Sequence, residues 1–200
     1  MFNRKTAPKV RDGRTQKKNR HAPTRLNSLG VGLERPSRGY RHVTSRQDIW
    51  KFLRLLPQWK RVSTDLDLIF LMSGSDEYDG YYEYPHWPSI ALSAWPEDLI
   101  TRPLDAYYAQ HREIFATLGV RCEMEKDEMV CQFTEESARA YQLLHIFLHE
   151  LGHHEYRITK GRGKSGGSEL YAENYAIHWQ KRIWKKYCEA FSFKPLPQHS

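Results

Sequence analysis

The sequence lacks several features that would place it in a membrane or outside the cell. None of its apolar runs comes near the roughly 18 residues that a membrane-spanning helix needs. The basic start, Met1 to Lys9, is not followed by an apolar stretch, so we expect no secretory signal. The three cysteines are an odd number and favour a reducing compartment over a disulfide framework. These absences predict a cytoplasmic location and no membrane span.

Acidic residues and large apolar residues are both scarce at the start of the chain. Residues 1–46 carry thirteen Lys and Arg against two acidic residues, a net charge of +11, whereas the remaining residues carry −4. Such a segment buries too little surface to offset its chain entropy. We therefore predict a disordered basic tail over residues 1–43, whose removal leaves the folded domain of residues 44–194 intact. A solvated arm is the plainest interpretation, and nucleic acid is a candidate polyanionic partner.

Beyond the tail, the pattern of apolar residues predicts an α+β fold. Turn residues, prolines and glycines separate short strand-like runs from longer helix-like ones. Residues 44–48 form a capping pattern at the start of a helix that ends before Pro57. The further expected elements are strands over residues 65–72, 80–84 and 89–95, a helix over 104–118, a hairpin over 120–133 centred on Lys126 and Asp127, and helices over 140–154 and 168–184.

Two of the three cysteines fall within the expected hairpin. Cys122 and Cys131 lie directly opposite each other if the turn has two residues. Facing cysteines can form a disulfide or bind a metal, but a four-ligand site needs another pair, and Cys188 is isolated. We therefore expect Cys122 and Cys131 to be small buried side chains.

The segment His149-Glu150-Leu151-Gly152-His153 is the strongest functional signal in the sequence. This H-E-x-x-H pattern lies within an apolar run of helical period, and residues four apart share one face of a helix. His149 and His153 can therefore hold one metal ion between their imidazoles. Glu150 is placed to accept a proton from a water whose pKa a zinc ion has lowered. A helix with two buried histidines and no metal is the alternative interpretation.

A catalytic zinc usually has three protein ligands, so the motif requires a third residue. After a Gly- and Ser-rich loop, a second helical pattern carries Glu169 and Glu173 four residues apart on one face. One of them can bind zinc while the other accepts the N–H of a ligand histidine. Ala172 and Ala176 add a small-residue face, which permits close approach of another helix. Both glutamates could otherwise be solvated surface acids.

The two motifs together, H-E-x-x-H and then E-x-x-A-[DE] on a second helix, resemble those of the gluzincin metallopeptidases, and most closely their small minigluzincin cores. The resemblance covers about residues 134–184. It implies a zincin-like core and one zinc ion per chain, held by His149, His153 and Glu169. It also implies that Glu150 is the catalytic base and that Glu173, which stands where Asp is usual, hydrogen-bonds a ligand histidine.

Three further histidines near these motifs need separate interpretations. His145 extends the histidine stripe by one turn, but a straight helix cannot bring three such residues to one ion, so we expect a packed histidine. His154 is rotated about 100° from His153 and points elsewhere. His178, on the second helix, is the rival third ligand.

These residues predict a zinc-dependent metallopeptidase in which the edge of the sheet pairs with an extended peptide substrate. The candidate edge strands are Ser89–Ala94 and Gly80–Tyr84. The alternatives are a zincin-fold binding or regulatory protein with little turnover, and a hydrolase of a non-peptide amide. The side chains that could stabilise the oxyanion are Tyr171, Tyr175, His111 and His86.

Overall fold

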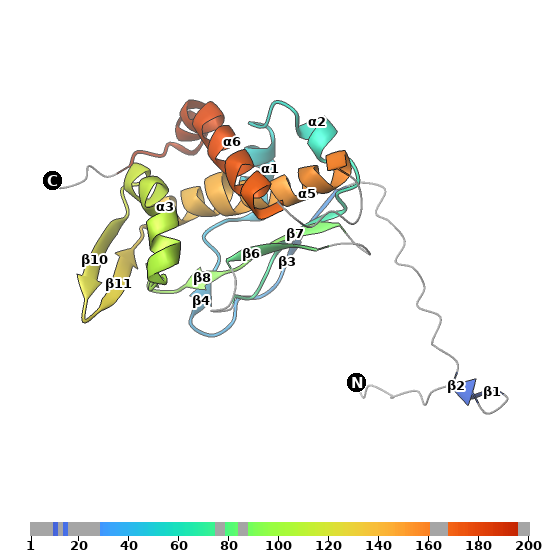
Figure 1. Ribbon diagram of the computed structural model, residues 1–200, viewed down its shortest axis with the longest axis horizontal. Helices are drawn as coiled ribbons and strands as arrows, with labels where there is room; N and C mark the ends of the chain where they lie inside the picture. The colour runs from blue at the N-terminus through green and yellow to red at the C-terminus, as the bar shows by residue number, and fades with distance from the viewer. Residues whose placement is uncertain are drawn as a thin grey trace.

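The chain forms a mixed α and β structure in which α1, α5 and α6 lie on the same side of a small sheet (Figure 1). This computed structural model describes residues 10–11, 14–15, 29–74, 79–83, 88–160 and 168–195. Among the helices of these residues, none is both long and apolar enough to cross a membrane. The predicted α+β class is confirmed at this level.

The main sheet has four strands in the order β3-β5-β7-β6. Three of them, β3 (Gly30–Leu33), β5 (Leu68–Leu71) and β7 (Ser89–Leu92), run parallel, and β6 (Gly80–Glu83) is antiparallel to β7. Strand β7 pairs with β5 on one side and with β6 on the other, so it is interior and cannot present a free edge. Of the two candidate edge strands, the structure therefore selects the one that begins at Gly80.

The predicted boundary between tail and domain at residue 43 is wrong. Strand β3 pairs with β5 along its full length, and β4 (Tyr40–Arg41) pairs with β8 (Trp95–Pro96). The domain therefore begins near residue 29, and removal of residues 1–43 would take a strand from its main sheet. The composition of the basic segment hid a strand of only four residues, two of which are glycine. Earlier in the chain, β1 (Val10–Arg11) pairs with β2 (Arg14–Thr15); the other residues before residue 29 lie outside the described residues.

Most of the remaining predicted elements are present. Helix α1 (Arg46–Leu53) begins with a capping box between Ser45 and Asp48. The expected hairpin turns at Lys126 and Asp127, both with positive φ. No sequence pattern predicted the short helix at residues 59–62 or the strand at residues 100–101 that extends the hairpin sheet. The elements of this part are α2 (Trp59–Val62), β9 (Ile100–Thr101), α3 (Asp105–Thr117), β10 (Arg121–Glu125) and β11 (Glu128–Gln132).

Cys122 and Cys131 are directly opposite in the hairpin, as the two-residue turn requires, and they form a disulfide. The expectation of two unlinked small side chains is therefore wrong. Side chains of directly opposed residues on antiparallel strands are close enough to bond, and the spacing alone could not tell a thiol pair from a disulfide. Cys188 is the free cysteine. The odd cysteine number no longer supports a reducing compartment, and the cytoplasmic location stays a prediction.

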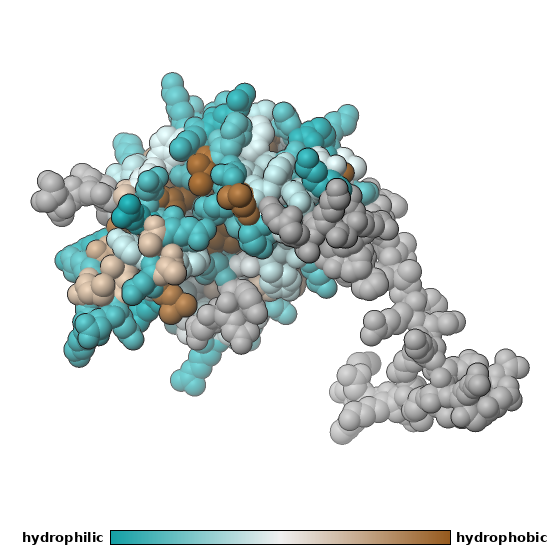
Figure 2. Space-filling view, in the orientation of Figure 1, coloured by the Kyte–Doolittle hydropathy of each residue, from teal (hydrophilic) through white to brown (hydrophobic). Residues whose placement is uncertain are grey.

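One long helical stretch crosses the sheet and carries the H-E-x-x-H motif. It consists of α4 (Glu135–Tyr141), a π-helical segment η1 (Gln142–Phe147) and α5 (Leu148–Lys160). A single regular helix was expected here, and π segments are often found at functional sites. Helix α6 (Ser168–Phe191) packs against α5. Aromatic contacts from Phe52 to Phe147 and Tyr187 join α1, η1 and α6 in the core. On the face shown in Figure 2, hydrophobic residues appear only as small separate patches.

His154 connects α5 to the edge strand and to the loop after α2. The hydroxyl group of Tyr82 lies 3.0 Å from its Nδ1, and its Nε2–H donates to the Thr64 carbonyl at 2.9 Å. Burial, with the charge of Arg157, lowers the pKa of His154 to about 4. The ring is therefore neutral in the folded protein, and it points away from His153 and the metal motif, as predicted.

This buried neutral histidine predicts acid sensitivity of the metal-free protein. Below the unfolded pKa of about 6.5 the unfolded chain binds a proton that the folded chain does not accept until the pH approaches 4, so stability is lost as the pH falls across this window. The loss attributable to His154 is about 3 kcal/mol. Denaturant unfolding measures the free energy of unfolding at pH 7 and at pH 4. The variant His154→Gln keeps an N–H donor for Thr64, and it should reduce the difference between the two free energies by about 3 kcal/mol. An unchanged difference would show that His154 does not cause it.

Candidate metal centre

The two histidines of the motif lie one helical turn apart on α5, and their Nε2 atoms are 3.1 Å from each other. The carboxylate of Glu169, in the first turn of α6, lies 3.4 Å from the Nε2 of His149 and 3.4 Å from that of His153. Both rings are partly buried, and the Glu169 side chain is 81% exposed. The structure therefore brings together the three residues that the sequence predicted as ligands, in a group that is open to solvent on the Glu169 side.

The shape of this group fits a zinc ion. Nitrogen and oxygen ligands about 2.0–2.2 Å from a tetrahedral zinc lie roughly 3.3 Å from one another. The three separations found between His149, His153 and Glu169 are close to this value. Three ligands occupy three corners of the tetrahedron and leave the fourth open to water or substrate, as in catalytic zinc sites. Zinc binding itself stays a prediction.

Glu173 takes the position that the motif resemblance implied for it. The Nδ1–H of His149 donates to its Oε2 at 3.2 Å, which leaves the Nε2 lone pair of that ring free for a metal. Burial would lower the pKa of His149, but the hydrogen bond to Glu173 and the charges of Glu150, Glu173 and Glu169 raise it overall. Burial would raise the pKa of Glu173, but the bond from His149 and the nearby histidines lower it. Glu173 is therefore a carboxylate that orients the His149 ring.

Gly152 allows the two helices to approach closely enough for these contacts. A Cβ atom at this position would lie 2.7 Å from the Ala172 Cα, 3.1 Å from the Ala172 carbonyl oxygen and 3.1 Å from the Tyr175 Cβ. Ala172 and Ala176 are fully buried, so the predicted small-residue face of the second helix is confirmed. The fixed spacing between α5 and α6 is what places Glu169 and Glu173 against His149.

The variant Gly152→Ala is expected to separate these helices, because the added Cβ meets backbone atoms that cannot move independently. We expect a loss of about 1–3 kcal/mol in the free energy of unfolding and a weaker affinity for zinc. The sign of the change in the free energy of unfolding is diagnostic, because Gly→Ala in a helix without close neighbours stabilises the protein by about 1 kcal/mol. Denaturant unfolding and competition with a zinc chelator measure both effects, and a variant as stable as the parent would contradict the close-packing argument.

Glu150 is buried beside His149, with 8% of its surface exposed. Burial raises the pKa of its carboxyl to about 7, although the charge of His149 and a hydrogen bond from the Tyr82 backbone act in the opposite direction. Because Tyr82 belongs to β6, the edge strand passes next to this carboxyl. The sequence did not assign Tyr82 to the site; once β6 is known to be the edge strand, its alternation indicates which of its residues face α5.

The other histidines weighed as ligands are placed elsewhere. His178 is exposed on α6, contacts Trp179, and belongs to neither metal-ligand group found among the described residues, so the rival three-histidine site is not formed. His145 is 4% exposed and stacks on Tyr141, in agreement with the expected packed histidine.

The four candidates for an oxyanion donor have different surroundings. Tyr171 is hydrogen-bonded to Glu155, and Tyr175 lines a small cavity with residues of α2 and α5. His111 packs against His145 near Glu173, and His86 lies outside the described residues. A larger cavity of about 620 Å³ has Asp79, Tyr107 and Tyr141 among its lining residues, but none of His149, Glu150, His153 and Glu169 reaches it.

Comparison with known proteins finds no counterpart: no protein-family model, curated protein or solved structure matches this chain. The assignment of the site therefore depends on its geometry and on the motifs.

Proposed function

We propose that this chain is a zinc-dependent metallopeptidase with a zincin-like core of the gluzincin kind. The observation that carries the proposal is the convergence of His149, His153 and Glu169 on one point, with Glu150 buried beside them. A purely structural zinc site would be closed by a fourth protein ligand and would not need an adjacent buried acid. The supporting architecture is a motif helix that crosses the sheet next to an antiparallel edge strand.

A zinc ion held by these residues would polarise the scissile carbonyl and make a bound water more acidic. Glu150 accepts the proton of the attacking water and later donates it to the leaving amine. A group that performs both steps works best with a pKa near the operating pH, and in the metal-free protein burial raises the pKa of Glu150 to about 7. Glu173 keeps the His149 ring in one tautomer throughout the reaction.

Strand β6 is suited to position the substrate. Among the described strands it pairs only with β7, so its other edge can receive an extended peptide next to Tyr82, whose backbone already contacts Glu150. Gly80 lets this strand lie against η1, since a Cβ there would be 2.7 Å from the Ile146 side chain. A peptide added to this edge would run past Glu150, which the Tyr82 backbone contacts. Main-chain pairing favours unfolded or flexible peptide segments with little sequence preference.

The test is cleavage of a panel of denatured proteins by zinc-loaded protein, with and without chelator, analysed by mass spectrometry of the new termini. We expect chelator-sensitive cleavage that zinc restores. Bound zinc with no cleavage of any substrate would instead favour the zincin-fold binding protein, and cleavage only of small non-peptide amides would favour the third alternative. Nucleic-acid binding through the basic residues before residue 29 is a separate proposal, tested by the salt dependence of binding.

A further inference from the structure

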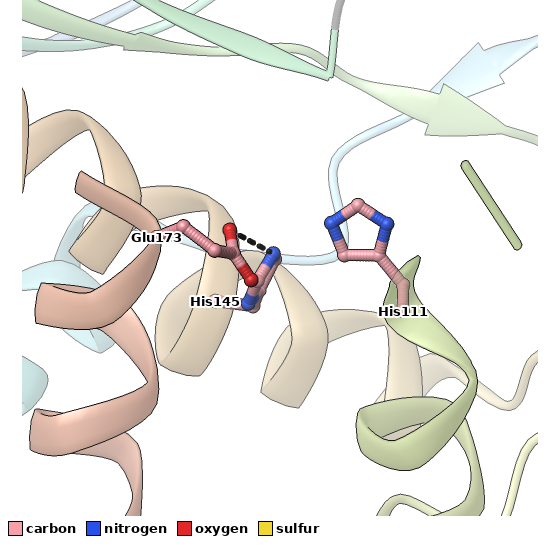
Figure 3. A group of neighbouring side chains, drawn as sticks. All are labelled: His111, His145 and Glu173. Carbon is pink, nitrogen blue, oxygen red and sulfur yellow. Dashed lines mark ion pairs between the residues drawn. The ribbon is translucent and has the colours of Figure 1, made fainter. Parts of the chain in front are cut away.

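A second group of side chains that could bind a metal lies beside the first and shares one residue, Glu173, with the proposed reaction. It consists of His111 from α3, His145 from η1 and Glu173 from α6, and one ligand atom of each lies within 4.8 Å of the others. Figure 3 shows the three side chains directed toward a common space from three separate helices. His111 and His145 are 6% and 4% exposed, so the group is more enclosed than the His149 group.

His145 carries an unexplained polar atom. Its Nδ1 is buried and has no hydrogen-bond partner in the described structure, and its Nε2 is 3.7 Å from the Oε2 of Glu173. An unpaired buried nitrogen costs about 1–3 kcal/mol, so its presence calls for a partner such as a water or an ion. Burial lowers the pKa of His145 to about 3, so the ring is neutral and keeps a lone pair that can bind a metal.

His111 is already held as a metal ligand would be. Its Nδ1–H donates to the Tyr107 carbonyl at 2.7 Å, which places the lone pair on Nε2. Burial lowers the pKa of His111 as well. The two rings meet edge to face with centroids 4.7 Å apart, and Tyr141 stacks on His145 at 5.2 Å. Both rings are therefore fixed in place before any ion binds.

The donor set of the group also favours a cation. Two of its three side chains, His111 and His145, are buried imidazoles, and Glu173 adds a carboxylate. The Glu173 Oε2 that accepts from His149 is also the oxygen 3.7 Å from the His145 Nε2, and a carboxylate oxygen has a further lone pair that can bind an ion. Two imidazoles with one carboxylate suit Zn²⁺ and neighbouring divalent transition metals better than Mg²⁺ or Ca²⁺.

We propose that His111, His145 and Glu173 form a second, buried site for a divalent transition metal such as Zn²⁺. Glu173 is the residue that this site shares with the His149 group, whereas His111 and His145 carry no step of the proposed hydrolysis. The single zinc ion expected from the sequence then becomes two ions per chain when metal is abundant. A buried water molecule between His111 and His145 is the competing occupant.

The test counts bound metal after equilibration of the full chain with Zn²⁺, and again with Co²⁺, whose absorption reports each ligand set. The parent is expected to bind about two equivalents and His153→Ala about one. His145→Phe keeps the ring stack but removes both nitrogens. This variant and His111→Gln should each lose the ion of the second site and retain about one equivalent at the first site. His178→Phe, an exposed histidine on α6, is the matched control and should keep both.

The outcomes separate this site from the proposed function. The parent could bind one equivalent instead of two. If His153→Ala then removes this ion while His145→Phe and His111→Gln keep it, the second site is overturned and the peptidase proposal stands. If His145→Phe and His111→Gln remove it while His153→Ala keeps it, the second site is supported and the peptidase site is overturned. A parent without metal after equilibration would overturn both.

Discussion

The variant Glu150→Gln is expected to keep the fold and bound zinc but to lose peptide hydrolysis by at least about a hundredfold. The amide has nearly the same shape as the carboxyl and can still accept the hydrogen bond from the Tyr82 backbone, but it cannot take a proton from water. The effect should fall on kcat more than on KM, because the acid acts on the reacting water. Steady-state cleavage of a fluorogenic peptide, with metal analysis of the same samples, measures it.

Glu155→Gln is the matched control for this prediction. Glu155 is a buried acid on the same helix, and its partner is Arg61. Loss of that ion pair should lower stability but leave the cleavage rate at low temperature close to that of the parent. If Glu150→Gln cleaves as fast as the parent, Glu150 is not the base; if neither protein cleaves any substrate, the binding-protein alternative gains.

The candidate site was largely predictable because its parts are encoded locally. The four-residue spacing of His149 and His153, and again of Glu169 and Glu173, defines which side chains share a helix face. Gly152 on one helix and Ala172 on the other indicate that the two faces can approach. What remained open was the assignment of the two glutamates, and the distances now place Glu169 at both Nε2 atoms and Glu173 at the Nδ1 of His149.

The features that the sequence did not predict depend on contacts between distant segments. Strand β3 becomes recognisable only through its pairing with β5, and the choice of β6 as the edge follows from strand order, which no local pattern contains. His111 and His145 belong to different helices and meet only in the folded chain. Sequence spacing could identify His145 as a packed histidine, but not that its Nδ1 would lack a hydrogen-bond partner.

Replacement of the two α6 acids is expected to affect zinc binding very differently. Glu169→Ala removes one of three ligands, so zinc should be lost or bound far more weakly. Glu173→Ala removes only the acceptor that orients His149, and such changes weaken binding by roughly 10- to 100-fold. Both variants should be made in the His145→Phe background, so that only the first site is counted, and measured by competition with a chelator of known affinity.

Conservative replacements sharpen this comparison. Glu173→Gln keeps an oxygen that can accept the Nδ1–H of His149, so it should restore much of the affinity that Glu173→Ala loses. Glu169→Gln should not, because a neutral amide is a poor substitute for a carboxylate ligand of zinc. A reversed order of the two alanine variants would move the third ligand to Glu173. If zinc affinity were unchanged in Glu169→Ala and Glu173→Ala but lost in His178→Ala, the site would consist of three histidines. Helix α6 would then have to lie differently from the arrangement in which Gly152 contacts Ala172.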